Sequence, residues 1–184
     1  WSETTVKGLY SAGEVAGGEV ELHAVAVVKA GVFSVVKVLV YVFGVDVLAA
    51  ASATDWLVAV AGFTILAASV VALRSDNLKR RLAYSTVSQL SYVVLAAALL
   101  APMSIVGAVM HIAAHALGYI LHVSAAAAIY TAAHKTEVSQ LDGIGRRMPW
   151  TMTAFAVGAL SMIGVPPAAG FLSKWFMLQA GMQD

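Results

Sequence analysis

Long apolar stretches alternate with short polar ones along the chain, and the apolar stretches define the expected elements. Each is apolar around its whole circumference rather than along one stripe, which is typical of helices that face lipid. Charged and turn-forming residues mark the connections between them. The pattern predicts five hydrophobic segments, at about residues 22–43, 56–73, 85–100, 102–130 and 150–182.

The first segment, Leu22 to Phe43, shows why these stretches are expected to be helices. It is rich in β-branched residues, which would favour a strand in water, but its length exceeds that of ordinary strands. A helix of this length crosses a hydrocarbon core of about 30 Å and satisfies its own backbone groups inside the bilayer. The predicted fold class is therefore all-α, a multi-pass transmembrane bundle of about five spans.

The last span is expected to be broken between Gly164 and Gly170. The sequence there is GVPPAAG, and its two prolines remove backbone donors and clash with preceding carbonyls. An α-helix cannot run through this stretch, so two half-helices should flank an unwound segment. Irregular backbone at membrane depth is tolerated where it is buried in protein or lines a cavity.

Composition supports a membrane protein and excludes several functions. The chain is 60% hydrophobic and only 11% charged, roughly half the charged fraction of a soluble domain. A formal net charge of +1, with no single basic patch, argues against a nucleic-acid partner. Cysteine is absent, which excludes disulfides, iron–sulfur clusters and thiolate metal sites within these residues. The lipid bilayer is the expected surrounding.

The polar segments predict the domain organisation and the topology. Residues 1–21 read as an irregular polar lead-in, and 22–184 as one transmembrane helical domain. The chain starts without Met and ends beside a hydrophobic helix, so we expect it to be part of a longer protein. The basic loops, 74–81 and 135–147, are expected to face the cytoplasm. The expected location is a bacterial or archaeal plasma membrane.

Three lysines lie within or beside the apolar segments. A lysine exposed to lipid near the bilayer centre costs about 2.5–3.5 kcal/mol, so such residues usually have a function or reach an interface. Lys29 and Lys37 are eight residues apart, which places both toward one side of a helix, and either can extend toward an interface. Lys174 follows the predicted break by four residues, beside unwound backbone. A buried lysine can hold and release a proton.

Three histidines and Tyr119 lie along one face of the fourth segment. His111 and His115 are at i and i+4, and His122 is seven residues further. They suit a relay of titratable groups, although hydrogen bonds between helices are an alternative. We expect no metal and no cofactor, because no further ligand lies nearby in sequence and a haem would need histidines on facing helices. The third segment carries the polar residues Ser85, Thr86 and Ser88. They are a second candidate path, and hydrogen bonding between helices is the alternative.

Four sequence stretches together resemble a known family. They are HAVAVVKAGVFSVVKVLVYVFG, NLKRRLAYSTVSQLSYVVL, MHIAAHA and GIGRRMPWTMTAFAVGALSMIGVPPAAGFLSKWFML. In this order they resemble the antiporter-like subunits of respiratory complex I, an NADH:quinone oxidoreductase, and of Mrp-type cation/proton antiporters. The resemblance covers about residues 22–182. It implies partners that are other membrane subunits, with protons, and Na⁺ as a candidate, as the transported ions.

The resemblance also implies roles for individual residues. Lys29 matches the lysine near the family's first broken helix, His111 and His115 match its central histidines, and Lys174 matches the titratable residue of its later broken helix. The sequence departs from the family at Tyr119, where many members carry a lysine. It also departs upstream, where residues 1–20 do not resemble the family's Pro-rich broken helix and its paired lysine and glutamate are missing.

These observations leave a preferred function and two alternatives. The preferred one is proton translocation through buried Lys and His residues, by a subunit with no redox or hydrolytic site of its own. The first alternative is a membrane scaffold whose polar residues only hold helices together. The second, a b-type cytochrome, rests on the histidines alone. The proton relay is expected to comprise Lys29, His111, His115, His122 and Lys174, with Lys37, Ser85, Thr86, Ser88 and Tyr119 as a secondary polar path.

Overall fold

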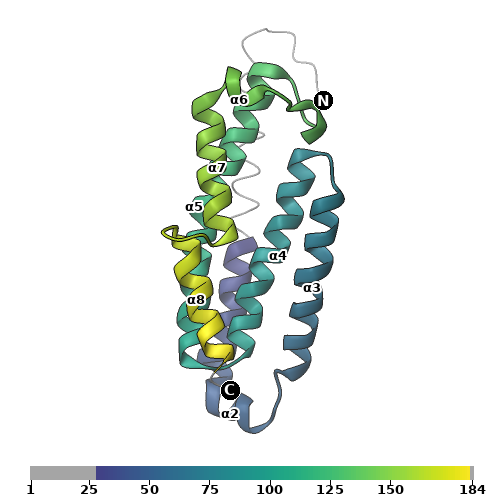
Figure 1. The fold of residues 1–184 in the computed structure, drawn as a ribbon. Coiled ribbons are helices and arrows are strands. Elements are labelled where there is room, and N and C mark those ends of the chain that lie inside the picture. Colours follow the sequence, from purple (N-terminus) through teal and green to yellow (C-terminus); the bar gives the residue numbers. More distant parts are fainter. Residues whose placement is uncertain (1–27, 183–184) are drawn as a thin grey trace, which may run out of the picture.

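The structure, a computed structural model, describes residues 28–182 as an elongated helical bundle (Figure 1). The elements in chain order are η1 (Val38–Gly44), α2 (Val45–Ala50), α3 (Asp55–Arg74), α4 (Leu78–Ala98), α5 (Pro102–Ala133), η2 (Val138–Gln140), α6 (Ile144–Arg147), α7 (Pro149–Ile163) and α8 (Ala169–Gly181). The described residues contain no β-strand, only an isolated bridge between Asn77 and Glu137. The predicted all-α class is confirmed. The lead-in of residues 1–21 lies outside the described residues, so the two-part division stays a prediction.

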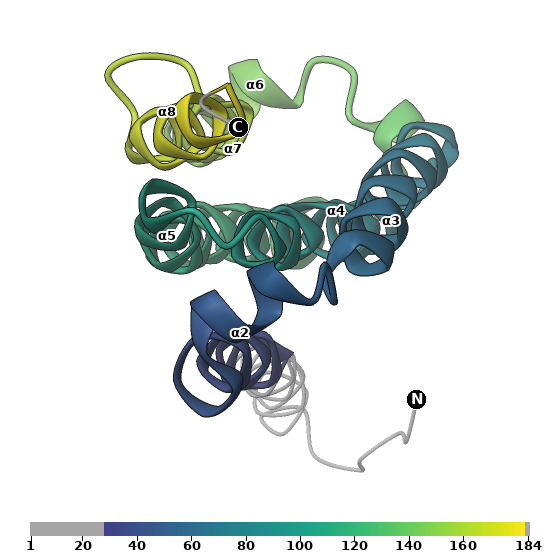
Figure 2. The same ribbon diagram turned by 90° about the horizontal axis from the view of Figure 1, so that it is seen from below.

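The bundle has three layers when it is seen from one end (Figure 2). Helices α3, α4 and α5 lie side by side in the middle layer. Helices α7 and α8 cover one face of this layer, and both pack against α5. The helix that includes η1 and α2 covers the other face. A side chain buried in the middle layer can therefore contact residues of the helices on either face of that layer.

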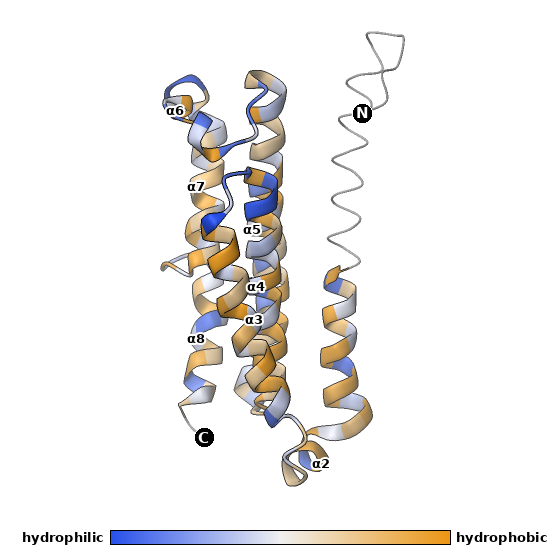
Figure 3. Cartoon of the chain, turned by 90° about the vertical axis from the view of Figure 1, so that its right-hand side faces the viewer, coloured by the Kyte–Doolittle hydropathy of each residue, from blue (hydrophilic) through white to orange (hydrophobic). Residues whose placement is uncertain are grey.

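Three described helices are long and apolar enough to cross a membrane, Val28–Ala50, Asp55–Arg74 and Pro102–Ala133. Helix α4, with 21 residues, has a spanning length but a polar first half. Helices α7 and α8 are stacked end to end, so they make one interrupted crossing (Figure 1). Hydrophobic residues dominate the length of the bundle, and hydrophilic ones gather where α4 begins and near α6 (Figure 3).

The helix ends follow from local sequence. Asn77 caps α4, because its side-chain oxygen accepts a hydrogen bond from the Arg80 backbone N–H at 3.1 Å. Pro102 stands in the first turn of α5, where its missing N–H costs nothing. Helix α7 ends at Gly164, whose φ of 91° lies in the left-handed region that favours glycine. The predicted break is confirmed, since the next helix begins at Ala169.

Two helices extend further along the chain than the predicted segments. The first predicted segment ends at residue 43, but α2 follows at Val45–Ala50 after a change of direction at Gly44, whose φ is 82°. The fourth segment continues past Tyr130 to Ala133, giving 32 residues and a length of about 48 Å. Apolar residues continue past both predicted ends, at 47–51 and 132–133, so hydropathy alone does not mark these ends sharply.

Small residues let the helices approach closely at the centre. Val93, Ala96, Ala97 and Ala108 are fully buried where α4 meets α5. A Cβ atom at Gly158 of α7 would lie 3.1 Å from the Gly118 carbonyl oxygen of α5. Such close contacts are typical of helix packing in membranes, where van der Waals contact replaces the hydrophobic effect.

Candidate functional site

His111 and His115 are buried at the centre of the bundle. Each is 1% exposed, and both lie on α5 in the middle layer. Their spacing of four residues stacks the two side chains on one face of the helix, with ring centroids 6.3 Å apart. The sequence prediction that these histidines lie together inside the protein is therefore supported by the structure.

His111 has a hydrogen-bond partner on each of two other helices. Its Nδ1 lies 2.9 Å from the Ser173 hydroxyl of α8, and its Nε2 lies 3.2 Å from Gln89 Oε1 of α4. The Ser173 hydroxyl can also donate to the Gly170 carbonyl oxygen at 3.1 Å. One imidazole thus joins three helices.

This set of partners suits two protonation states of His111. When Ser173 donates to Gly170, both ring nitrogens of His111 face acceptors, which fits the imidazolium. When the Ser173 hydroxyl turns its hydrogen toward Nδ1, the ring is neutral and only Nε2 donates, to Gln89. A single hydroxyl rotation accommodates the gain or loss of a proton.

His115 is buried without hydrogen-bond partners in the described part of the chain. Neither of its ring nitrogens has one. It lies between the ring of His111 and that of Tyr119, whose centroid is 5.9 Å away in a stacked arrangement. Buried polar groups nearly always have partners, and water or another protein segment supplies them where side chains do not.

Lys174 extends from α8 to the break before it. Its ammonium donates to the Met162 carbonyl oxygen at 2.7 Å and to that of Ile163 at 3.4 Å, at the C-terminal end of α7. A cation is favourable there because the last carbonyls of a helix have no intrahelical donors. The same nitrogen lies 5.2 Å from the ring centroid of Tyr92, which is 6.4 Å from that of His111.

Lys29 occupies the corresponding place on the other side of α5. It is half-buried, and its ammonium lies 5.4 Å from the ring centroid of Tyr119. Cation–π contacts of this length stabilise a positive charge in a poorly solvated site. Between the two lysines, successive rings are 5.9–6.4 Å apart. We call this set the buried row: Lys174, Tyr92, His111, His115, Tyr119 and Lys29.

The buried row crosses the middle layer of the bundle. Lys174 belongs to α8 on one face, and Lys29 belongs to the helix on the opposite face (Figure 2). The histidines and Tyr119 come from α5 between them. Side chains from four helices therefore form one line through the interior.

Two residues predicted for the site lie apart from this row. His122 hydrogen-bonds through Nδ1 to the Gly118 carbonyl oxygen at 2.9 Å, and its ring meets Phe155 of α7 at a centroid distance of 4.5 Å. Lys37 is exposed on the outer side of its helix, whereas Lys29 faces inward. The roles predicted for these two residues stay predictions.

The polar residues of α4 divide between helix contacts and an open cleft. Thr86 is buried, and its hydroxyl donates within its own helix, to the Leu82 carbonyl oxygen at 3.0 Å. Ser88 binds α3, through Ser69 Oγ at 2.9 Å and the Ile65 carbonyl oxygen at 3.2 Å. Ser85 and Ser88 also line a cleft of about 330 Å³ between α3 and α4, together with Ser69, Ala72, Leu73, Arg81 and Gln89.

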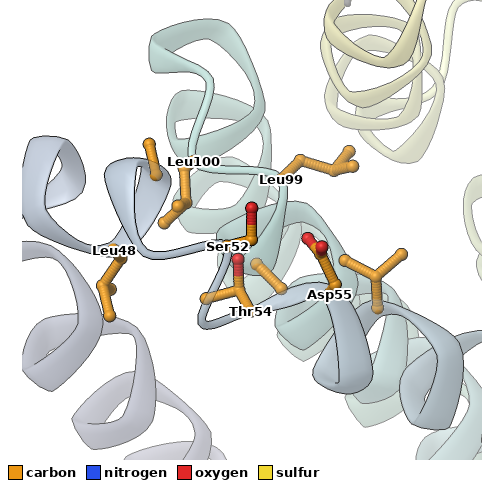
Figure 4. A pocket seen from close by; sticks show the side chains of 9 residues that line it. Leu48, Ser52, Thr54, Asp55, Leu99 and Leu100 are labelled. Carbon is orange, nitrogen blue, oxygen red and sulfur yellow. The ribbon is translucent and has the colours of Figure 1, made fainter.

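A second and larger cleft lies at the end of the bundle away from the basic loops (Figure 4). Its volume is about 500 Å³, and α2, the start of α3 and the end of α4 surround it. The Asp55 carboxylate and the Ser52 and Thr54 hydroxyls are its polar side chains. In the part of the chain described here, no three His, Asp or Glu side chains converge as a metal site requires.

Sequence reasoning missed three members of the site. Tyr92, Gln89 and Ser173 were not predicted to contact the histidines. Only the position of Ser173 next to Lys174 hinted at its contact with His111. Gln89 and Tyr92 are three residues apart on α4, a spacing that would have placed them on one face.

The fold and the buried row define an integral membrane helical bundle with titratable side chains across its interior. The chain belongs to the NADH:quinone oxidoreductase/Mrp antiporter transmembrane family, whose sequence model matches residues 18–184. The resemblance drawn from the four sequence motifs is therefore confirmed.

Relatives of known type agree with this assignment. NADH-quinone oxidoreductase subunit N of Desulforudis audaxviator is 40% identical over 116 residues, which cover 62% of this chain and 23% of the relative. The structure of the membrane-bound sulfane sulfur reductase, an archaeal respiratory membrane complex, matches with a TM-score of 0.81 and 29% identity. That match covers 91% of this chain and 34% of the other.

The Mrp complex from a Dietzia species matches with a TM-score of 0.68 and 28% identity, over 83% of this chain and 16% of the other. The chain spans a quarter or less of the length of the curated relatives that it matches. It is thus similar to one portion of much larger membrane subunits.

Proposed function

We propose that this chain conducts protons through the buried row, as part of a subunit in a multi-subunit membrane complex. The observation that carries the proposal is the line of four rings between two lysines, inside a bundle of spanning helices. Membership in a family of respiratory and antiporter subunits supports it. Protons are the proposed substrate, and Na⁺ exchange is a further possibility raised by the resemblance alone.

His111 is the proposed exchange point of the row. Its partners accept both the neutral and the protonated ring after one rotation of the Ser173 hydroxyl. His115 continues the path toward Lys29, with water or another segment completing its hydrogen bonds. Lys174 and Lys29 hold positive charge at the two ends, each over an aromatic face.

A scaffold function competes with this proposal. The bonds of His111 to Ser173 and Gln89 also fasten α5 to α8 and α4, and bonds of this kind stabilise membrane bundles by about 0.6 kcal/mol each. A scaffold does not require a buried imidazole at His115, because this side chain hydrogen-bonds to none of the described helices and so fastens none of them together. This observation favours a role beyond packing.

The test is proton uptake into vesicles that contain the full-length parent complex, with and without Lys174→Met. Methionine keeps the length and apolar stem of lysine but cannot hold a proton. We expect uptake to fall by about 100-fold at equal assembly, the scale on which a positioned proton-transfer group acts.

The matched control is Lys37→Met, which removes a lysine that lies outside the row. We expect this variant to assemble and to take up protons at the wild-type rate. If Lys174→Met also assembles and retains wild-type uptake, the relay is wrong and the scaffold function is favoured.

The distribution of basic residues supports a separate proposal for the sidedness of the protein. The basic residues of loops 74–81 and 135–147 lie at one end of the bundle, near α6 and the start of α4 (Figure 3). An excess of Lys and Arg marks the cytoplasmic side of membrane proteins. We therefore place this end in the cytoplasm, in a bacterial or archaeal plasma membrane.

A further inference from the structure

The cleft between α3 and α4 begins at the basic end of the bundle. Arg81 lies at its outer end, where the guanidinium donates to the Ser75 carbonyl oxygen at 3.0 Å and to that of Leu73 at 3.3 Å. These bonds fix the arginine on the last turn of α3. The Arg81 side chain at the outer end of the cleft is therefore tethered to α3.

The inner end of the same cleft is Gln89, eight residues further along α4. Eight residues of helix extend about 12 Å, which is a large part of one membrane leaflet. The Gln89 side chain that lines the cleft is also the partner of His111 Nε2 at 3.2 Å. One side chain thus connects the cleft with the buried row.

The walls of the cleft between these ends carry hydroxyl groups. Ser85 is half-buried on α4, and Ser88 is paired with Ser69 across the two helices at 2.9 Å. A volume of about 330 Å³ corresponds to roughly ten water molecules at liquid density. Hydroxyl and amide groups both donate and accept, so they can hold a chain of water.

We propose that this cleft is the aqueous inlet through which protons from the basic end of the bundle reach His111, by way of Ser85, Ser88 and Gln89. The inference rests on the proposed function and adds its route. The cleft lining includes no carboxylate. Hard metal cations bind carboxylate and carbonyl oxygens, so this chemistry suits protons passed along water rather than a metal cation.

Cysteine substitution in the full-length parent complex gives a direct test, because these residues contain no cysteine of their own and the unsubstituted complex measures the background labelling. Ser85→Cys places a thiol in the cleft, and Val87→Cys places one on the outer face of the same helix, where Val87 is 46% exposed. Each variant is treated with an anionic, membrane-impermeant methanethiosulfonate from either side of sealed vesicles. Labelling and proton uptake are then measured on the same sample.

We expect Ser85→Cys to react from the side of the basic loops, and Val87→Cys, facing lipid, to stay unlabelled from both sides. Labelled Ser85→Cys should lose most of the uptake that the same unlabelled variant shows. No labelling, labelling from the opposite side, or full labelling without loss of uptake would each overturn the inlet. Failure of the inlet can be told from failure of the proposed function. Labelling of Ser85→Cys tests access to the cleft whether or not the complex transports protons, whereas Lys174→Met tests conduction through the buried row.

Discussion

At the scale of single residues, the centre of the protein is built from polar groups that packing alone does not explain. His111 has partners on two helices, but His115, one turn away, has none among the described residues. A buried polar group without a partner destabilises a fold by about 1–3 kcal/mol. A side chain that reduces stability where it stands is a candidate for function.

Replacing His115 by Leu tests that reasoning. The substitution removes two ring nitrogens that bind none of the described residues and keeps a side chain of similar volume, so we expect the thermal stability of the parent complex not to fall. Proton uptake should fall by about 100-fold, because the row loses its central proton carrier. Stability and uptake are measured on the same vesicle preparation, with Leu117→Ala on the exposed face of α5 as the control. Loss of assembly in His115→Leu would instead indicate a packing role.

At the scale of elements, the break between α7 and α8 depends on a glycine at its far end. A Cβ atom at Gly170 would lie 1.8 Å from the Ser161 carbonyl oxygen, so no side chain fits without movement of the backbone. Ser161 belongs to the last turn of α7, and Gly170 to the first turn of α8. The two half-helices therefore touch through their backbones.

We expect Gly170→Ala to destabilise the parent complex by about 1–3 kcal/mol, the usual cost of overpacking. It should also reduce proton uptake, because Lys174 and Ser173 follow directly on α8. The control is Gly62→Ala on α3, where the nearest atom is 4.0 Å away and alanine favours the helix. Thermal unfolding of both variants measures the difference, and equal stability would contradict the close contact at the break.

The sequence predicted the elements more completely than their contacts. Hydropathy, the GVPPAAG stretch and the histidine spacing predicted the spans, the break and the face of α5 that is buried. These features are local, since they depend on residues within one or two turns. The pairing of Lys174 with Tyr92, and of His111 with Gln89 and Ser173, joins residues from different helices. Helix packing decides such pairs, and periodicity along one helix does not reveal them.

At the scale of the whole molecule, two loops distant in sequence are fastened together at the basic end. We call this contact the clasp, formed by residues 76–78 with residues 136–139. The Ser139 backbone N–H and hydroxyl donate to the two Asp76 carboxylate oxygens at 3.0 and 2.6 Å. Backbone bonds from Leu78 to Thr136 and from Val138 to Asp76 complete it. The clasp connects the α3–α4 turn to the segment that follows α5.

The clasp should be sensitive to acid. The side-chain and backbone hydrogen bonds from Ser139 hold the pKa of the Asp76 carboxyl below its ordinary value. A carboxyl group whose pKa is lowered by folding contributes its full stabilisation to the folded state above its ordinary pKa of about 4. This stabilisation is lost as the pH falls through the lowered pKa. We expect Ser139 to be protected from hydrogen exchange at pH 7 and to lose protection below about pH 4.

Asp76→Asn provides the control for this prediction. An amide cannot titrate, so the variant should show weaker protection of Ser139 that does not change over the same pH range. Hydrogen exchange followed by mass spectrometry, corrected for the intrinsic pH dependence of exchange, measures both proteins. Equal protection of the wild-type protein at both pH values would contradict the assigned role of the carboxylate.

The interrupted crossing also has a consequence for biogenesis. Helix α7 has 15 residues and α8 has 13, which correspond to about 22 and 20 Å, whereas the hydrocarbon core is about 30 Å thick. Neither half can insert alone as a span, and the unwound residues between them would expose backbone groups to lipid. Helix α5 packs against both halves, so it must be in place before they insert stably. During synthesis, the membrane insertion of the interrupted crossing therefore depends on the prior insertion of α5.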